Sequence, residues 1–266
     1  MKTFGKMVLL AIVAVMVLIV NASPGPDYAI TKKFGKKEVI KVNTISGDCI
    51  VRKAVGEGIE VMVLNNHSPR NAFEPRFCVR GNTLKLDERT NGSTNGNSMW
   101  ALSVPEGTQV EFESASGGLS VYGLEGEFVA KTASGNIQVE NCRGRFHMST
   151  ASGDVDATGV VIEGNSTFAS ASGVVNVKLA QSAEHDLHLG TASGKAILDY
   201  CGNPIKGYFE FTAKARQGGI VSPFDFDAEE KFDKHHDLYV RKTATKEIED
   251  PHVTIGTASG SAILRK

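Results

Sequence analysis

The sequence has 266 residues, with 29 Lys and Arg against 30 Asp and Glu and a formal net charge of −1. Hydrophobic residues make up 41% and aromatic residues 7%, with 28 glycines against 8 prolines, which excludes a disordered chain and favours many short strands joined by tight turns. Because no run of five like charges occurs, the sequence shows no electrostatic footprint for nucleic acid or an anionic membrane.

Residues 1–22 have the pattern of a secretory signal peptide. Lys2 and Lys6 give a basic start, residues 7–20 are apolar throughout, and Val20-Asn21-Ala22 fits a small-x-small cleavage site. Fourteen helical residues reach about 21 Å, short of the roughly 30 Å hydrocarbon core of a bilayer. We therefore predict that residues 1–22 are removed, that no membrane span remains, and that the mature protein is exported, to the periplasm, the cell surface or the medium.

The chain after the leader alternates into short strands. Residues 29–42 are basic and then alternate in polarity, which indicates the first strand and the cap of the fold. Further strands are expected between residues 47 and 64, with polar excursions near residues 65–76 and 91–97.

A four-residue phrase, Ser or Thr followed by Ala-Ser-Gly, then dominates the sequence. It begins at residues 114, 132, 150, 170, 191 and 257, and Thr44-Ile45-Ser46-Gly47 is an earlier relative. The steps of 18, 18, 20 and 21 residues through the middle of the chain are typical of a solenoid. Because a catalytic Ser is a single residue with an oriented base, we interpret the phrase as a corner, in which Gly supplies a backbone conformation that is costly for other residues.

Each period contains two alternating runs, one after the Gly and one before the next Ser or Thr. Leu119 and Val121 follow one corner, and Phe128 and Ala130 precede the next. Period-two alternation places these side chains inside, so each rung is predicted to be two short strands and two turns. The outward positions form a polar row that could serve as a flat ligand surface: Gln138, Asp156 and Asn176.

The regularity ends after Tyr200. Residues 209–220 indicate a degenerate rung, an acidic insertion occupies residues 223–237, and the last repeat ends the chain. The predicted fold is an all-β, single-domain parallel β-solenoid over residues 23–266, with about 18–21 residues and two short strands per rung and loop insertions near 65–76, 91–97 and 223–237.

The four cysteines allow a limited choice of disulfides in an exported chain. Cys142 and Cys201 share a column three rungs apart, about 14 Å, which is beyond the reach of a disulfide. Cys49 stands where later rungs have a buried apolar residue, and a bridge from it to Cys78 stays open.

The acidic insertion contains the densest group of candidate metal ligands. Carboxylates suit Ca²⁺ and a pair of imidazoles suits Zn²⁺, but neither the calcium-loop spacing nor a zinc-protease motif is present. The favoured interpretation is a solvated acidic loop whose phenylalanines pack on the solenoid, with no metal and no cofactor. The weak candidates for a metal are Asp225, Asp227, Asp233, His235, His236 and Asp237.

Four features of the sequence agree with one known pattern. They are the early Thr44-Ile45-Ser46-Gly47-Asp48, the turn at Leu102-Ser103-Val104-Pro105-Glu106-Gly107-Thr108, the stacked Ala-Ser-Gly rungs and the closing repeat. Together they resemble the adhesin-like "toast-rack" β-solenoid family of exported and envelope proteins, DUF4097. The resemblance covers nearly the whole mature chain. It implies a single-domain parallel β-solenoid outside the cytoplasm with adhesion or envelope-associated roles, and it offers no catalytic residues.

The preferred hypothesis is a non-enzymatic structural or interaction module of the cell envelope, with a protein or glycan at the cell surface as its partner and no nucleic acid. One alternative is an envelope-stress sensing module that works with a partner protein. The other is a polysaccharide-acting enzyme, because carboxylates could line a groove on a β-helix. The loops, and the acidic insertion above all, are where we expect any specific activity.

Overall fold

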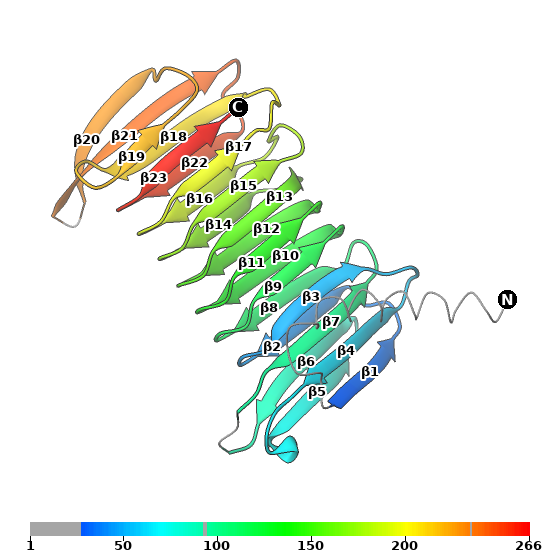
Figure 1. Ribbon diagram of the computed structural model, residues 1–266. Helices are drawn as coiled ribbons and strands as arrows, with labels where there is room; N and C mark the ends of the chain where they lie inside the picture. The colour runs from blue at the N-terminus through cyan, green and yellow to red at the C-terminus, as the bar shows by residue number, and fades with distance from the viewer. Residues whose placement is uncertain (1–27, 93–94, 235) are drawn as a thin grey trace.

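The computed structural model describes residues 28–92, 95–234 and 236–266 as an elongated stack of rungs (Figure 1). Each rung is one strand of a sheet that we name sheet B, a corner, and one strand of a facing sheet that we name sheet A. The described residues contain no α-helix and one 3₁₀ turn, η1 (Arg70–Ala72). The predicted all-β solenoid is confirmed, whereas the predicted leader lies outside the described residues.

Sheet A contains eleven strands among the described residues. In spatial order they are β1 (Tyr28–Phe34), β4 (Ile59–Asn65), β7 (Ser98–Val104), β3 (Asp48–Lys53), β9 (Leu119–Tyr122), β11 (Ile137–Glu140), β13 (Val155–Ile162), β15 (Val175–Leu179), β17 (Ala196–Asp199), β23 (Ser261–Arg265) and β19 (Gly219–Val221).

Sheet B contains twelve strands among the described residues. In spatial order they are β5 (Phe73–Arg80), β6 (Thr83–Thr90), β2 (Val39–Thr44), β8 (Gln109–Ser114), β10 (Glu125–Thr132), β12 (Arg143–Thr150), β14 (Ser166–Ser170), β16 (Leu187–Thr191), β22 (His252–Thr257), β18 (Gly207–Lys214), β21 (Asp237–Lys246) and β20 (Ala228–Lys234).

Parallel pairing in register places equivalent residues of successive rungs in columns. Ile137 of β11 lies between Leu119 of β9 and Val155 of β13, and all three side chains are buried. In sheet B the buried rings of Phe128, Phe146 and Phe168 stack, with centroids 5.5 and 5.7 Å apart. Each rung alone cannot bury its apolar side chains, so the core between the sheets forms only when rungs stack.

The order of the rungs in space differs from their order in the sequence. The rung made of β2 and β3 lies between that of β6 and β7 and that of β8 and β9. At the other end, the rung made of β22 and β23 lies between that of β16 and β17 and that of β18 and β19. The last repeat therefore ends the chain but not the stack, and residues 39–42 belong to an interior rung and not to a cap.

Antiparallel strands cover both ends of the stack. β1 and β4 extend sheet A and β5 extends sheet B at one end, whereas β21 and β20 extend sheet B at the other (Figure 1). The excursion expected at residues 65–76 is shorter, because β4 continues to Asn65 and β5 begins at Phe73. The acidic insertion is not a loop throughout, because residues 228–234 form β20.

Candidate functional site

The repeated phrase forms the corner between the sheets, and its first residue hydrogen-bonds along the stack. The Thr150 hydroxyl donates to the carbonyl oxygen of Gly135 in the preceding rung, at 3.0 Å, and accepts from the amide of Gly153 in its own rung, at 3.1 Å. The same two bonds occur at Thr132, Ser170, Thr191 and Thr257. Each hydroxyl therefore satisfies two backbone groups at the corner, which explains Ser or Thr at this position.

The Gly that ends the phrase allows the rungs to approach each other. A Cβ added at Gly153 would lie 2.0 Å from the carbonyl oxygen of Gly135, and the equivalent distance is 2.0 Å or less at Gly117, Gly135, Gly173, Gly194 and Gly260. None of these glycines has a positive φ. The expected reason for Gly, an unusual backbone conformation, is therefore wrong, and close contact between neighbouring corners replaces it.

A buried carboxylate ends the stack of corners on the N-terminal side. Asp87 of β6 pairs with Asn43 of β2. The next residue of β6, Glu88, therefore lies beside Thr44, the first residue of the first corner. Its Oε2 accepts hydrogen bonds from the three amides of the first corner, Ile45, Ser46 and Gly47, at 2.8, 3.3 and 3.1 Å. Oε1 accepts from the Ser98 hydroxyl at 3.3 Å. A carboxylate held by three backbone amides closes a corner that has no preceding corner to stack on.

The outer face of sheet A presents the predicted polar row. Ser120 pairs with Gln138, Gln138 with Asp156, and Asp156 with Asn176, so these side chains follow one another along the stack. Asn176 Nδ2 donates to Asp156 Oδ2 at 3.2 Å, and Gln138 Nε2 donates to Glu140 Oε1 at 2.7 Å. Parallel strands lie about 4.8 Å apart. The row therefore presents a hydroxyl, two amides and a carboxylate at that spacing over four rungs.

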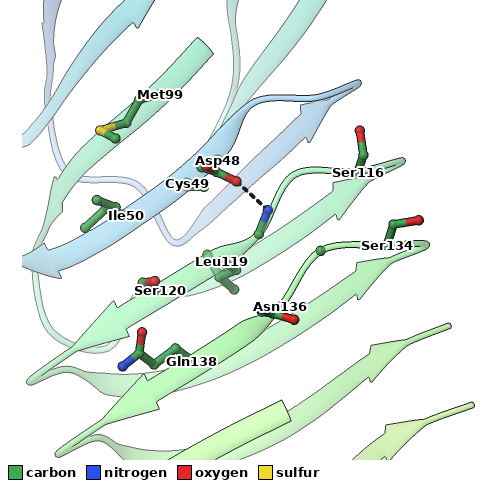
Figure 2. Close-up of a pocket in the computed structure, with 12 residues that line it drawn as sticks. Asp48, Cys49, Ile50, Met99, Ser116, Leu119, Ser120, Ser134, Asn136 and Gln138 are labelled. Atoms are coloured by element: carbon green, nitrogen blue, oxygen red, sulfur yellow. Dashed lines mark hydrogen bonds between the residues drawn. The ribbon is translucent and has the colours of Figure 1, made fainter. Parts of the chain in front are cut away.

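A hollow of about 470 Å³ lies at the N-terminal end of this row. Two small residues leave this space. Gly118 stands where the next rungs have the longer Asn136 and Asp154, and Ser120 lies between the longer Ile50 and Gln138. Figure 2 shows Asp48 and Asn136 on two sides of the hollow. The adjacent glycines at 117 and 118 are the signal in the sequence that could have revealed this hollow, which the repeat pattern alone did not predict.

The polar lining of the hollow mixes acceptors and donors. Oδ1 of Asp48 accepts a hydrogen bond from the Gly118 amide at 2.7 Å, drawn in Figure 2. The Ser116 and Ser134 hydroxyls stand at the corners on one side, and the Gln138 amide lies on β11, the strand next to that of Ser120 (Figure 2). These groups can exchange hydrogen bonds with hydroxyls of a ligand.

The opposite side of the hollow is apolar. Met99 and Ile50 line it (Figure 2). Beyond them, Ala101 lies between Met62 and Ile50 on the outward face of its strand and is only 2% exposed, because these larger neighbours cover it. The hollow therefore combines one apolar wall with a polar wall.

The acidic insertion, where we expected specific activity, is an end cover of the core. Phe224 and Phe226 pack on the buried Phe209 and Phe211, with centroids 5.3 Å apart in each of the pairs Phe209–Phe224 and Phe211–Phe226. Phe232 instead stacks on Tyr239, at 5.9 Å. The interpretation that phenylalanines of this segment pack on the solenoid therefore holds for Phe224 and Phe226.

The candidate metal ligands of this segment are divided among separate partners. Asp237 pairs with Lys214 at 2.8 Å, and Oδ2 of Asp227 accepts the Thr245 amide at 2.7 Å. Asp225 and Asp233 are exposed, and His236 lies at a turn with φ 67°. His235 lies outside the described residues. In the described part of the chain, no three His, Cys, Asp or Glu side chains are grouped to hold a metal ion.

The excursion after β4 packs against the loop that follows β6. The His67 ring is buried and stacks on Phe73, with centroids 4.7 Å apart. A Cβ at Gly96 would lie 2.5 Å from the His67 Cα, so this glycine permits the contact. The excursion is therefore fixed by packing.

All four cysteines are free thiols, so the bridge from Cys49 to Cys78 is wrong. Cys49 lies on β3, an interior strand of sheet A, whereas Cys78 lies on β5, at the end of the facing sheet B, so the two thiols are on different sheets. Burial raises the pKa of the Cys49 and Cys142 thiols above its usual range, so these thiols stay protonated.

The described residues thus define a class of protein: a β-solenoid in which the repeat builds the scaffold and rows of polar side chains line the outer faces. Residues 29–206 match the Toastrack DUF4097 family, and the chain belongs to that family. Within the described residues, none of the helical structure is long and apolar enough to cross a membrane.

Solved structures of low sequence identity are similar to this chain. A candidate adhesin from Bacteroides fragilis is 9% identical with a TM-score of 0.46, and the match covers 91% of this chain and 98% of that one. A candidate cell adhesion protein from Clostridium sporogenes is 15% identical with a TM-score of 0.31, and covers 90% and 98%. No protein of curated function matches the sequence.

Proposed function

We propose that the protein is an exported, adhesin-like interaction module without enzymatic activity, and that it binds a polar saccharide chain through the outer face of sheet A. The observation that carries this proposal is the row of Ser120, Gln138, Asp156 and Asn176, which begins at the hollow. Solenoids present such repeated rows as extended binding surfaces.

The chemistry of the row suits a saccharide. A saccharide chain repeats hydroxyl groups along its length, and the row presents a hydroxyl, two amides and a carboxylate at the strand spacing of about 4.8 Å. Most contacts would be single hydrogen bonds of about 1 kcal/mol each, so affinity would come from several rungs acting together. The hollow beside Met99 and Ile50 would receive the apolar face of one sugar ring.

The enzyme alternative gains no support from the hollows of the described residues. Glycoside hydrolysis uses two carboxylates that flank one bond. The hollows on sheet A, on sheet B and beside β21 each contain one carboxylate, respectively Asp48, Asp186 and Glu229. Each is already engaged, Asp48 and Asp186 with backbone amides and Glu229 with Lys242. The sensing alternative would need a partner protein on these same faces.

A glycan and matrix-protein array with the protein lacking residues 1–22 tests the proposal. We expect binding to polysaccharides and no release of shorter products from them. Ser120→Tyr would fill the hollow from an outward strand position, and Gln138→Ala would remove one member of the row. Each variant should lower the array signal at least fivefold.

Glu113→Tyr provides the matched control. Glu113 is an exposed residue of β8 in sheet B, away from the row and the hollow on sheet A. This variant should bind like the unaltered protein, and all variants should keep the same unfolding temperature. An array without any saccharide signal, or equal losses in Ser120→Tyr and Glu113→Tyr, would contradict the proposal.

A further inference from the structure

The outer face of sheet B, opposite the row on sheet A, has its own hollow of about 220 Å³. It is lined from four neighbouring strands, β12, β14, β16 and β22, and three of its side chains are imidazoles: His147, His188 and His252. Thr167 and Thr254 supply hydroxyls beside them. The volume suits a small charged group and part of a sugar ring.

The register explains the hollow. His147 pairs with Thr167, and Thr167 pairs with His188, so a short side chain lies between two imidazoles. Ser166 pairs with Leu187, so the residues that precede them, Asn165 and Asp186, lie level with each other in the neighbouring row. The hollow is the space that the short Thr167 leaves between the longer side chains of His147 and His188.

A strip of small residues beside the imidazoles keeps the face flat. The register of β12, β14, β16 and β22 places Ser149, Ala169, Gly190 and Gly256 in one row. The His188 ring lies over Gly190, because its Nε2 is 3.2 Å from the position of an added Cβ. Nothing lies within 4 Å of that position at Gly256. A chain-like ligand could therefore approach the imidazoles along the sheet.

The fixed charges around the hollow are nearly balanced. Asp186 is the carboxylate in the lining, and its Oδ1 accepts the His252 amide at 3.0 Å. Glu210 on β18 faces His188 from two strands away and pairs with Arg241 at 3.5 Å, and Arg241 also pairs with Glu230 of β20 at 3.2 Å. On the other side, Arg145 of β12 lies 3.9 Å from Glu127 of β10.

The protonation state of the imidazoles determines the sign of the net charge around the hollow. With all three neutral, Asp186 and the carboxylates that share Arg241 leave a negative excess, and with all three protonated the net charge becomes positive. Partial burial lowers the pKa of His188 below its usual 6.5, against the opposing effect of Glu210. A group whose folded pKa is lowered contributes stability above the unfolded pKa of about 6.5, and this contribution is lost as the pH falls below it. A bound anion would offset that loss.

We propose that this hollow is a second binding site, for the carboxylate or sulfate group of an acidic saccharide, and that it accepts the group when its histidines are protonated. Charge-assisted hydrogen bonds from imidazolium N–H groups hold the anion, and the Thr167 and Thr254 hydroxyls complete the contacts. The proposal does not depend on sheet A.

Nuclear magnetic resonance of the protein lacking residues 1–22, with labelled histidine, provides the test. The probes are a galacturonate trisaccharide for the carboxylate alone, a heparin hexasaccharide for sulfate together with carboxylate, and maltotriose as the neutral control. We expect the imidazole signals of His147, His188 and His252 to shift with at least one acidic probe, with at least tenfold tighter binding at pH 5.5 than at pH 7.5. Maltotriose should not shift these signals.

Variants separate this site from the sheet A site and from general charge. His188→Gln and His147→Gln should each weaken the acidic probe at least fivefold at pH 5.5, whereas His185→Gln, on the exposed turn outside the hollow, should not. Ser120→Tyr on sheet A should leave this binding intact. Equal affinity at the two pH values, full binding by both hollow variants, or a requirement for a divalent cation would overturn the proposal.

Discussion

At the scale of single residues, the corner phrase is a hydrogen-bonding and packing device. The Thr150 hydroxyl joins the Gly135 carbonyl to the Gly153 amide, and the missing side chain at Gly153 lets the two corners touch. Each corner depends on the preceding one, which explains why the phrase varies so little while the second turn of the rung changes in length. A residue that repeats in every rung for this reason is not available for a specific ligand.

The close contact predicts a large cost for Gly153→Ala. The added Cβ would lie 2.0 Å from a backbone oxygen, which cannot move without separating two rungs. We expect a loss of roughly 3 kcal/mol or more in the free energy of unfolding, measured in urea. Gly256→Ala is the matched control, because nothing lies within 4 Å of its Cβ position in strand β22, and it should be neutral or slightly stabilising. Similar losses in both variants would show that close contact is not the reason for the glycine.

Glu88 should be as important as any corner hydroxyl, although it lies outside the repeat. Glu88→Ala leaves the amides of Ile45, Ser46 and Gly47 without their acceptor, at a cost of about 2–4 kcal/mol. Glu88→Gln keeps an acceptor oxygen and should lose less. Glu113→Ala, at an exposed position of β8, should change stability by less than about 0.5 kcal/mol in the same urea experiment. A neutral Glu88→Ala would contradict the capping role.

At the scale of elements, both ends of the stack are finished by antiparallel strands and not by the repeat. At the C-terminal end, β18 is followed by a segment that carries Phe224 and Phe226 back over the buried Phe209 and Phe211. β20 then pairs with β21 as a charged outer edge, which discourages association with other sheets. The acidic composition of this segment reflects an exposed edge strand as well as a turn.

Removing an apolar contact of this cover should therefore matter more than removing an acidic group. We expect Phe226→Ser to lower the free energy of unfolding by about 2 kcal/mol, because its ring packs edge-on against Phe211. Asp233→Asn, at an exposed position of β20, should change it by less than about 0.5 kcal/mol. Thermal unfolding with added Ca²⁺ or Zn²⁺ also tests the metal candidates, since a rise in the unfolding temperature that Asp233→Asn abolishes would support a metal site there.

At the scale of the whole molecule, the sequence allows the rung to be predicted but not the order of rungs. Alternation around each Gly identifies inward residues such as Ile137 and outward ones such as Gln138, because period-two geometry is local. The insertion of β2 and β3 between later rungs depends on which apolar edges meet in space, and near-identical repeats carry little information about that choice.

The candidate sites also differ in how far the sequence predicts them. The polar row of Gln138, Asp156 and Asn176 follows from spacing and was predicted. The hollow at Gly118 depends on Ile50 and Met99 from β3 and β7, which reach it only through the changed rung order. The imidazoles of the sheet B hollow come from rungs far apart in the sequence, so their proximity could not be found by scanning for a motif.

A stack whose rungs contact only their neighbours should tolerate the loss of one whole rung. Deleting residues 136–153 joins Gly135 to Asp154 and preserves the corner, the alternation and the pairing of β13 onto β9. We expect a shorter protein that folds and unfolds cooperatively but has a lower free energy of unfolding, because one interface between neighbouring rungs is lost. Deleting only residues 145–153 removes most of β12 and shifts every later strand to the wrong sheet, so this variant should not fold. Circular dichroism and small-angle scattering distinguish the two, and equal behaviour would mean that the stack is not built rung by rung.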